Sequence, residues 1–166
     1  MRLYHGSYVV VQEPLVYVGR RSLDFGPGFY VTKLKDQAEK WARRVRTIRN
    51  ANSAYVSAYE FDIETWLKTK ANAPRHLVLN AYDEQWLDFI VASRKGQHPW
   101  KGFDVIEGGV ANDQVIDTVE DYFAGRITIE QALGLLRFAK PTHQMCINSQ
   151  NIVEQYLKFT DAFKIE

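Results

Sequence analysis

Cysteine is almost absent from this chain of 166 residues, because Cys146 is the only one. A single thiol excludes an internal disulfide, and disulfides are typical of proteins in oxidising compartments. Long apolar runs are also lacking, at the N-terminal end as elsewhere, so we predict no signal segment and no membrane span. These absences predict a cytoplasmic protein that does not act in a membrane, with Cys146 packed in its core.

An excess of charge of one sign is missing too, since the formal net charge is +1. That balance excludes a general attraction to nucleic acid or to acidic surfaces. The sequence has no Gly-x-Gly-x-x-Gly after a strand, no Walker loop and no Cys/His spacing of a metal centre, so no metal is expected. What is present is a hydrophobic fraction of 46%, enough for the core of one domain over residues 1–166.

The hydrophobic patterning predicts an α+β fold, because short strands and helices follow one another without strict alternation. The predicted strands are Leu3–Val11, interrupted at Gly6-Ser7, then Phe29–Val31, Ala54–Phe61, Arg75–Leu79, Phe103–Ile106, His143–Ile147 and Phe159–Ile165. The predicted helices are 36–46, Ile63–Lys68, Asp83–Ser93, a run from Asp113 closed by Gly125, Ile129–Leu136 and Gln150–Leu157. Caps are expected from Asp83, Thr128 and Ser149, and a strand break at Gly108-Gly109.

The stretch Asp24–Thr32 contains two glycines and a proline that force a turn, followed by the aromatic pair Phe29 and Tyr30. Glycine lets the backbone approach a flat ligand, because no Cβ stands in the way. Strand alternation sends the two rings to opposite faces, so that one fills the core and the other is free to stack. With His5-Gly6-Ser7 upstream, this stretch predicts a binding site between two strands.

The helix predicted over 36–46 has an apolar face formed by Ala38, Trp41, Ala42 and Val45. Its other face and its tail are basic, with Lys40, Arg43, Arg44, Arg46 and Arg49. Two interpretations stay open for these cations: a solvated helix face, or a surface that contacts phosphates or nucleic acid.

Three of these segments, His5-Gly6-Ser7, Gly26-Pro27-Gly28-Phe29-Tyr30 and Gln144–Ile147, together resemble the three-part signature of ADP-ribosyltransferases of the diphtheria-toxin and poly(ADP-ribose)-polymerase type. More closely, the chain resembles a bacterial family of unknown function, DUF3990, that is grouped with those transferases. The stretches that carry this resemblance are Leu3–Ser7, Asp24–Thr32, Trp86–Phe89, Gly108–Val115 and Gln144–Ile147. The resemblance implies an ADP-ribosyltransferase-like split β-sheet core with flanking helices.

The resemblance also implies that NAD is the co-substrate and that its nicotinamide end is surrounded by three strands. His5 would bind ribose hydroxyls, the backbone of Gly6 would bind the nicotinamide carboxamide, and Tyr30 would stack on the ring. Gln144 stands where the catalytic glutamate of that group usually lies. Further residues expected to contact NAD are Ser7, Gly28 and the pair Arg20 and Arg21, whose charges either neutralise the diphosphate or are solvated in a loop.

Gln144 departs from the acidic version of the signature, and an amide cannot take a proton from an acceptor. A carboxylate from another segment is then needed, and Asp104, Glu107 and Asp113 flank the glycine pair at 108–109. Asn112 with Asp113 either lines the acceptor side or caps a helix. His143, beside Gln144, is expected on the opposite strand face and in a structural role.

The function expected from the resemblance is transfer of a single ADP-ribose from NAD to a macromolecular acceptor. A bacterial toxin or defence effector, with an antitoxin as a further partner, would fit that activity. Two alternatives stay open. One is a module that binds NAD, ADP-ribose or a protein with weak catalysis or none, and the other is an RNA-modifying ADP-ribosyltransferase or phosphotransferase.

Overall fold

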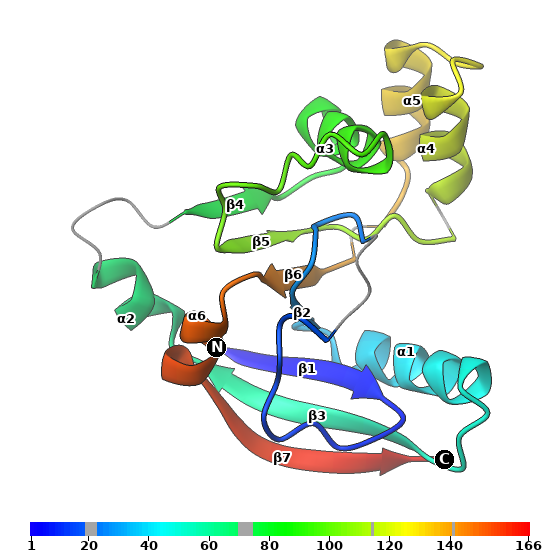
Figure 1. Ribbon diagram of the computed structural model, residues 1–166. Helices are drawn as coiled ribbons and strands as arrows, with labels where there is room; N and C mark the ends of the chain where they lie inside the picture. The colour runs from blue at the N-terminus through cyan, green and yellow to red at the C-terminus, as the bar shows by residue number, and fades with distance from the viewer. Residues whose placement is uncertain (19–22, 70–74, 114, 141) are drawn as a thin grey trace.

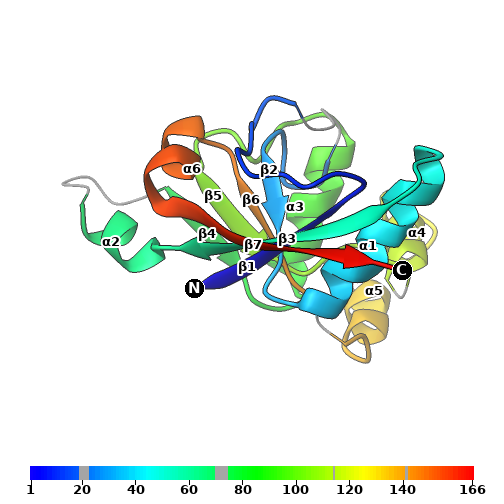
Figure 2. The same cartoon turned by 90° about the horizontal axis from the view of Figure 1, so that it is seen from below.

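Two β-sheets, stacked on one another, form the centre of this computed structural model, which describes residues 1–18, 23–69, 75–113, 115–140 and 142–166. Sheet A has the strand order β1-β3-β7, with β1 at Arg2–Ser7, β3 at Ala54–Phe61 and β7 at Leu157–Ile165. Sheet B has the order β2-β6-β5-β4, with β2 at Phe29–Val31, β6 at Gln144–Ile147, β5 at Val105–Gly108 and β4 at His76–Leu79. The strands of one sheet run across those of the other (Figures 1 and 2).

Helices flank both sheets (Figure 1). Helix α1 (Lys35–Ile48) packs on β1 and β3 of sheet A. Beyond sheet B lie α3 (Glu84–Arg94), α4 (Ile116–Phe123) and α5 (Ile129–Leu136), while α2 (Ile63–Lys68) and α6 (Gln150–Tyr156) contact each other at one end of the molecule. The α+β class predicted from the sequence is confirmed.

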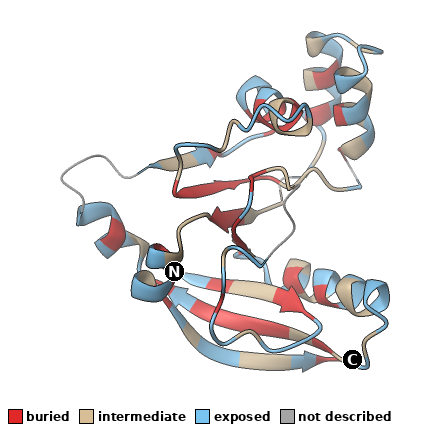
Figure 3. Cartoon of the chain, in the orientation of Figure 1, coloured by how far each residue is buried: buried red, intermediate tan, exposed pale blue. Residues whose placement is uncertain are grey.

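Buried side chains form three clusters, one on each side of the two sheets and one between them (Figure 3). The inter-sheet cluster includes Leu3 of β1, Phe29 of β2 and Met145 of β6. The cluster between sheet B and α3 includes Trp86 and Cys146, and the thiol is fully buried as predicted. Burial raises the pKa of Cys146 to about 12, so this thiol is unsuited to nucleophilic chemistry.

A single backbone bridge joins the two sheets among the residues that the structure describes. The N–H of Tyr4 donates to the carbonyl of Thr32 at 2.8 Å, and the N–H of Thr32 donates to the carbonyl of Tyr4 at 2.9 Å. The backbones of β1 and the chain at the end of β2 are therefore joined at one residue pair and are otherwise split.

The contact between α1 and β1 is unusually close. A Cβ added to Gly6 would lie 2.1 Å from the backbone oxygen of Ala38 and 2.8 Å from the backbone nitrogen of Ala42. Only small residues fit along this line, which explains why Ala38 and Ala42 are buried while Trp41, expected on the same apolar face, is 41% exposed.

All predicted helices are present, and their ends differ from the prediction by a few residues at most. The side chain of Asp83 accepts the N–H of Trp86, and Thr128 forms a capping box with Gln131, as their sequence positions predict. Ser149, in contrast, makes no side-chain cap on α6.

Two strand predictions are wrong. β1 continues through Gly6 and ends at Ser7, so residues 8–11 are not a strand. Val11 is instead held by side chains of β3, since its N–H donates to Ser57 Oγ and its carbonyl accepts from the Tyr59 hydroxyl. The strand predicted at Phe103–Ile106 is displaced by two residues, since β5 begins at Val105 and ends at Gly108, within the predicted glycine break; a Cβ on Gly108 would lie 2.9 Å from Leu79. No described helix combines the length and apolar character that crossing a bilayer requires.

Candidate functional site

His5 projects from β1 into the space between the sheets, where its ring lies 4.6 Å from that of Phe29 between centroids. Its Nδ1 lies 2.7 Å from the carbonyl oxygen of Tyr30. A carbonyl only accepts, so Nδ1 carries the proton and Nε2 presents a lone pair. Burial lowers the pKa of His5, which keeps the ring neutral near pH 7. His5 is thus fixed as a hydrogen-bond acceptor at Nε2.

The backbone of Gly6 faces the split between the sheets. Because the N–H and C=O of Tyr4 are directed to β2, alternation along an antiparallel strand directs those of Gly6, two residues on, to the same edge. Beyond the Tyr4–Thr32 bridge, the backbone N–H and C=O groups on this edge of β1 have no backbone partner among the described residues. Gly6 is itself buried, and α1 covers one of its faces. Glycine is therefore required here by packing, whatever else it does.

Tyr30 lies on the face of sheet B that packs against the cluster around Trp86. Its hydroxyl donates to the carbonyl of Gly26 at 2.6 Å. Burial raises the pKa of the Tyr30 phenol far above its usual value, so the hydroxyl stays protonated. Tyr30 as a whole is half-buried, and its hydroxyl is already used in shaping the turn before β2.

Gln144 is the first residue of β6 and pairs with Gly108 of β5. Its half-buried side chain has no hydrogen-bond partner within the described part of the chain. Tyr30 pairs with Cys146, so Tyr30 and Gln144 share a face of sheet B, while His5 lies on the inter-sheet side. The three residues thus sit on neighbouring strands, β1, β2 and β6, with their side chains on two different faces.

The turn before β2 is tied to α3. The guanidinium of Arg94 binds the carboxylate of Asp24 at 3.1 and 3.2 Å, and Ser93 Oγ donates to the Asp24 carbonyl at 2.6 Å. Gly26 has a φ of +84°, and a Cβ on Gly28 would lie 2.6 Å from Cys146 Sγ. Both glycines are therefore dictated by the turn and by its contact with β6.

The positions of the remaining residues expected to contact NAD, and of the basic residues of α1, neither support nor oppose a role in binding. Ser7 is buried at the end of β1. Arg20 and Arg21 lie outside the described residues. The basic side chains of α1 are exposed or half-buried; Arg43 contacts Glu39 and the carbonyl of Glu166, and the Arg44 guanidinium lies 5.7 Å from the centre of the Trp41 ring.

Three of the four acceptor-side candidates lie outside the strands of the two sheets. Asp104 precedes β5 at the end opposite Gln144 and binds Arg75 at 2.6 Å. The carbonyl of Asn112 accepts the N–H groups of Val115 and Ile116, which begins α4. Asp113 is exposed beside it. The N-cap of α4 is Val115, without a side-chain cap hydrogen bond, so the capping role expected for residues 112–113 is not confirmed.

Glu107, the fourth candidate, is buried on the inter-sheet face of β5 and is surrounded by cations and imidazoles. Its Oε2 lies 3.0 Å from His143 Nε2 and 3.1 Å from Lys33 Nζ, and its Oε1 lies 3.3 Å from His76 Nε2. These contacts, with that of His143 first, hold the pKa of Glu107 far below its usual value. No group of side chains in the described ranges has an arrangement that could bind a metal ion.

Lys33 and His76 were not expected from the sequence, and His143 was expected to be structural. One signal could have indicated the cluster. Glu107 lies two residues after Val105 on a short apolar strand, so the two side chains share a face. A carboxylate on a buried face requires cationic partners.

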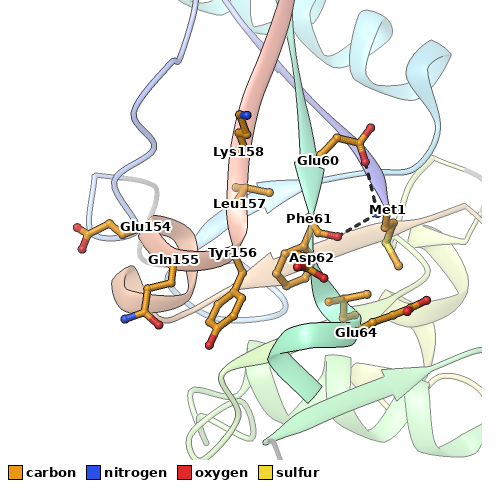
Figure 4. Close-up of a pocket in the computed structure, with 11 residues that line it drawn as sticks. Met1, Glu60, Phe61, Asp62, Glu64, Glu154, Gln155, Tyr156, Leu157 and Lys158 are labelled. Atoms are coloured by element: carbon orange, nitrogen blue, oxygen red, sulfur yellow. Dashed lines mark hydrogen bonds and ion pairs between the residues drawn. The ribbon is translucent and has the colours of Figure 1, made fainter. Parts of the chain in front are cut away.

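A pocket of about 800 Å³ lies elsewhere, beside Met1 and between the chain around Asp62 and the chain around Tyr156 (Figure 4). None of the predicted site residues lines it. It lies at the start of β1, whereas His5 and Gly6 lie toward the end of that strand. Its charged walls carry four carboxylates, Glu60, Asp62, Glu64 and Glu154, against the cation of Lys158 and the amino terminus, which disfavours a diphosphate ligand.

Comparison with known proteins gives one match. No curated protein and no solved structure matches the chain. The family model described as a protein of unknown function, DUF3990, matches residues 1–159, which confirms the nearer of the two resemblances seen in the sequence. The chain therefore belongs to the DUF3990 family.

Proposed function

We propose that the chain is an NAD-dependent ADP-ribosyltransferase whose nicotinamide site lies at the split between β1 and β2. The observation that carries the proposal is the edge of β1 just past the Tyr4–Thr32 bridge. There, His5 presents an acceptor at Nε2 and Gly6 directs an N–H and a C=O toward the same split. One donor and one acceptor on adjacent backbone atoms match the two polar atoms of a carboxamide.

The residues present fit this co-substrate. Main-chain groups of Gly6 would bind the carboxamide, and the Nε2 lone pair of His5 would accept a ribose hydroxyl. Gln144, whose amide has no partner among the described residues, would bind the hydroxyl of the nicotinamide ribose from β6. The half-buried Tyr30 would contact the pyridine with its ring, and its hydroxyl would keep the Gly26 turn in place.

Cleavage of the bond between nicotinamide and ribose sends the bonding electrons to the nicotinamide nitrogen and leaves positive charge on the sugar, to which the acceptor then bonds. This chain would contribute orientation: a neutral imidazole, a backbone pair and an amide, all fixed by neighbouring strands. Among the described residues, the carboxylate on the strand that pairs with β6 is Glu107, and it is already hydrogen-bonded by His143 and Lys33. The proton that the attacking nucleophile loses would pass to solvent, which favours nucleophiles that lose a proton readily.

A specific observation favours a second candidate, a domain that binds NAD or ADP-ribose without efficient transfer. An amide stands at position 144, and the buried carboxylate of Glu107 already accepts hydrogen bonds from His143 and Lys33. Gln144→Glu separates the two candidates. For a transferase limited by this position, we expect a faster release of nicotinamide from NAD; for a binding domain, we expect none.

The test of the proposal is incubation of the protein with NAD and a bacterial extract, with nicotinamide release and labelled acceptors as readouts. His5→Ala is expected to abolish both signals. His98→Asn is the matched control, because His98 has a φ of +55°, which asparagine tolerates, and belongs to a different loop. The proposal fails if wild-type protein neither binds NAD nor releases nicotinamide.

A further inference from the structure

The chain just before Gln144 is held by several elements, whereas the Gln144 amide itself is left without a described partner. Thr142 Oγ1 accepts the N–H of Val110 at 2.9 Å and lies 2.9 Å from the Tyr82 hydroxyl. The backbone of His143 is bound on both sides by one amide of α1: Gln37 Nε2 donates to its carbonyl at 2.6 Å, and its N–H donates to Gln37 Oε1 at 3.3 Å.

The His143 ring adds a second set of contacts with a defined direction. Its Nδ1 accepts the backbone N–H of Lys33 at 3.1 Å, so this nitrogen carries no proton. The proton therefore lies on Nε2, which donates to Glu107 Oε2 at 3.0 Å. The His143 ring thus links the backbone of Lys33, just beyond β2, to the buried carboxylate of Glu107 on β5, at the start of β6.

Glu107 is the group on which these contacts converge. Lys33 donates its Nζ to Glu107 Oε2 and its backbone N–H to the His143 ring, and His76 of β4 approaches the other carboxylate oxygen. One carboxylate thus connects β4, β5, the end of β2 and the start of β6. Its Oε2 accepts from His143 and Lys33 while its Oε1 lies 3.3 Å from His76 Nε2, so Glu107 is a poor proton acceptor but a firm anchor.

We propose that Glu107 is a positioning residue, which acts through His143 to fix the start of β6 and hence the place of the Gln144 amide. The inference rests on the proposed function, because that function gives Gln144 its ligand, the hydroxyl of the nicotinamide ribose. A preorganised amide matters there because the chain relies on orientation and not on proton transfer.

The first test is the protonation pattern of the His143 ring in the wild-type protein, read from its ring nitrogens by long-range ¹H–¹⁵N NMR. We expect a single Nε2–H form at neutral pH. In Glu107→Gln, which keeps the volume and removes the charge, we expect a mixture of ring forms. Hydrogen exchange at residues 143–145 should become faster by about tenfold, as expected when a hydrogen bond to a charged group is lost.

Asp121→Asn is the matched control, because it also removes an ion-paired carboxylate, the partner of Arg126 at 2.6 Å, but on α4. Exchange at residues 143–145 should not change in this variant. The proposal is overturned by an Nδ1–H form in the wild-type protein, or by equal exchange in Glu107→Gln and the control. If Glu107→Gln does not fold, the same exchange measurement on Lys33→Met tests the proposal. Lys33 is 41% exposed, and its loss removes one partner of the same carboxylate, so exchange at residues 143–145 should again become faster than in the control.

Turnover provides a readout that separates the two proposals. If the wild-type protein releases nicotinamide, Glu107→Gln should lower kcat by about tenfold with little change in the KM for NAD, as expected for a supporting residue. If the wild-type protein has no turnover, the proposed function fails, while the NMR and exchange results still decide whether Glu107 positions residue 144.

Discussion

The Nδ1 atom of His5 lies 2.7 Å from the carbonyl oxygen of Tyr30, so the imidazole of one sheet is bound to the main chain of the other. Together with the backbone bridge between Tyr4 and Thr32, this contact fixes β1 against β2 at the point where they separate. The same hydrogen bond determines the form of the ring, because it leaves the lone pair on Nε2. A structural contact thus prepares His5 for a ligand.

We expect the His5 ring to titrate below its ordinary value of 6.5, because burial disfavours the charged form. As pH falls below 6.5, the unfolded chain takes up this proton before the folded one, so stability decreases until the folded pKa is reached. NMR titration of the ring carbon protons measures the midpoint. A midpoint at or above 6.5 would contradict the buried, Tyr30-bound arrangement.

Gly6→Ala should destabilise the protein by about 1–3 kcal/mol, because the added methyl overlaps the α1 backbone and must displace the helix. Gly134→Ala is the matched control. Nothing lies within 4 Å of its added Cβ, and alanine in a helix interior gains about 0.5–1 kcal/mol over glycine. Urea unfolding measures both; equal effects of the two variants would show that α1 does not press on Gly6.

Arg94→Ala should destabilise the turn before β2 and cost about 1–3 kcal/mol, because it leaves the Asp24 carboxylate without its paired donors. The comparison is Arg126→Ala, which breaks an exposed pair with Asp121 and should cost less than about 1 kcal/mol. Thermal or urea unfolding distinguishes them. A cost for Arg94→Ala no greater than for Arg126→Ala would mean that the turn does not depend on α3.

Acid should weaken the fold partly through Glu107. His143, His76 and Lys33 hold the pKa of this carboxyl far below its usual value of 4.5, so the folded chain stays ionised where the unfolded chain is protonated. The stability from these contacts is present above the unfolded pKa and is lost as pH falls from there toward the folded pKa. The difference in unfolding free energy between wild type and Glu107→Gln should shrink between pH 7 and pH 3, and a constant difference would contradict this assignment.

Element types could be predicted from the sequence because the local patterns agree with the fold. The alternation of residues 54–61 and the capping residues Asp83 and Thr128 produced the strand and the helices that they predict. Residues 8–11 have equal strand propensity, yet they form none. A strand needs a partner as well as propensity, and Val11 is held by side chains of Ser57 and Tyr59 in place of a ladder.

Glycines and charges were harder to interpret from the sequence. Gly108 indicated a break, but it marks a close approach to Leu79 at the end of β5. Glu107 was considered as a catalytic carboxylate because it stands near the glycine pair. Its partners come from positions 33, 76 and 143, and no local pattern indicates that such distant residues converge on one side chain.

The central claim is that the split between β1 and β2 binds the nicotinamide end of NAD. Titration of ¹⁵N-labelled protein with NAD, followed by amide shifts, tests it most directly. We expect saturable changes concentrated at His5, Gly6, Tyr30 and Gln144, which are absent in His5→Ala and retained in His98→Asn. The claim is contradicted if NAD causes no saturable change, or if the changes gather around the pocket lined by Asp62 and Tyr156.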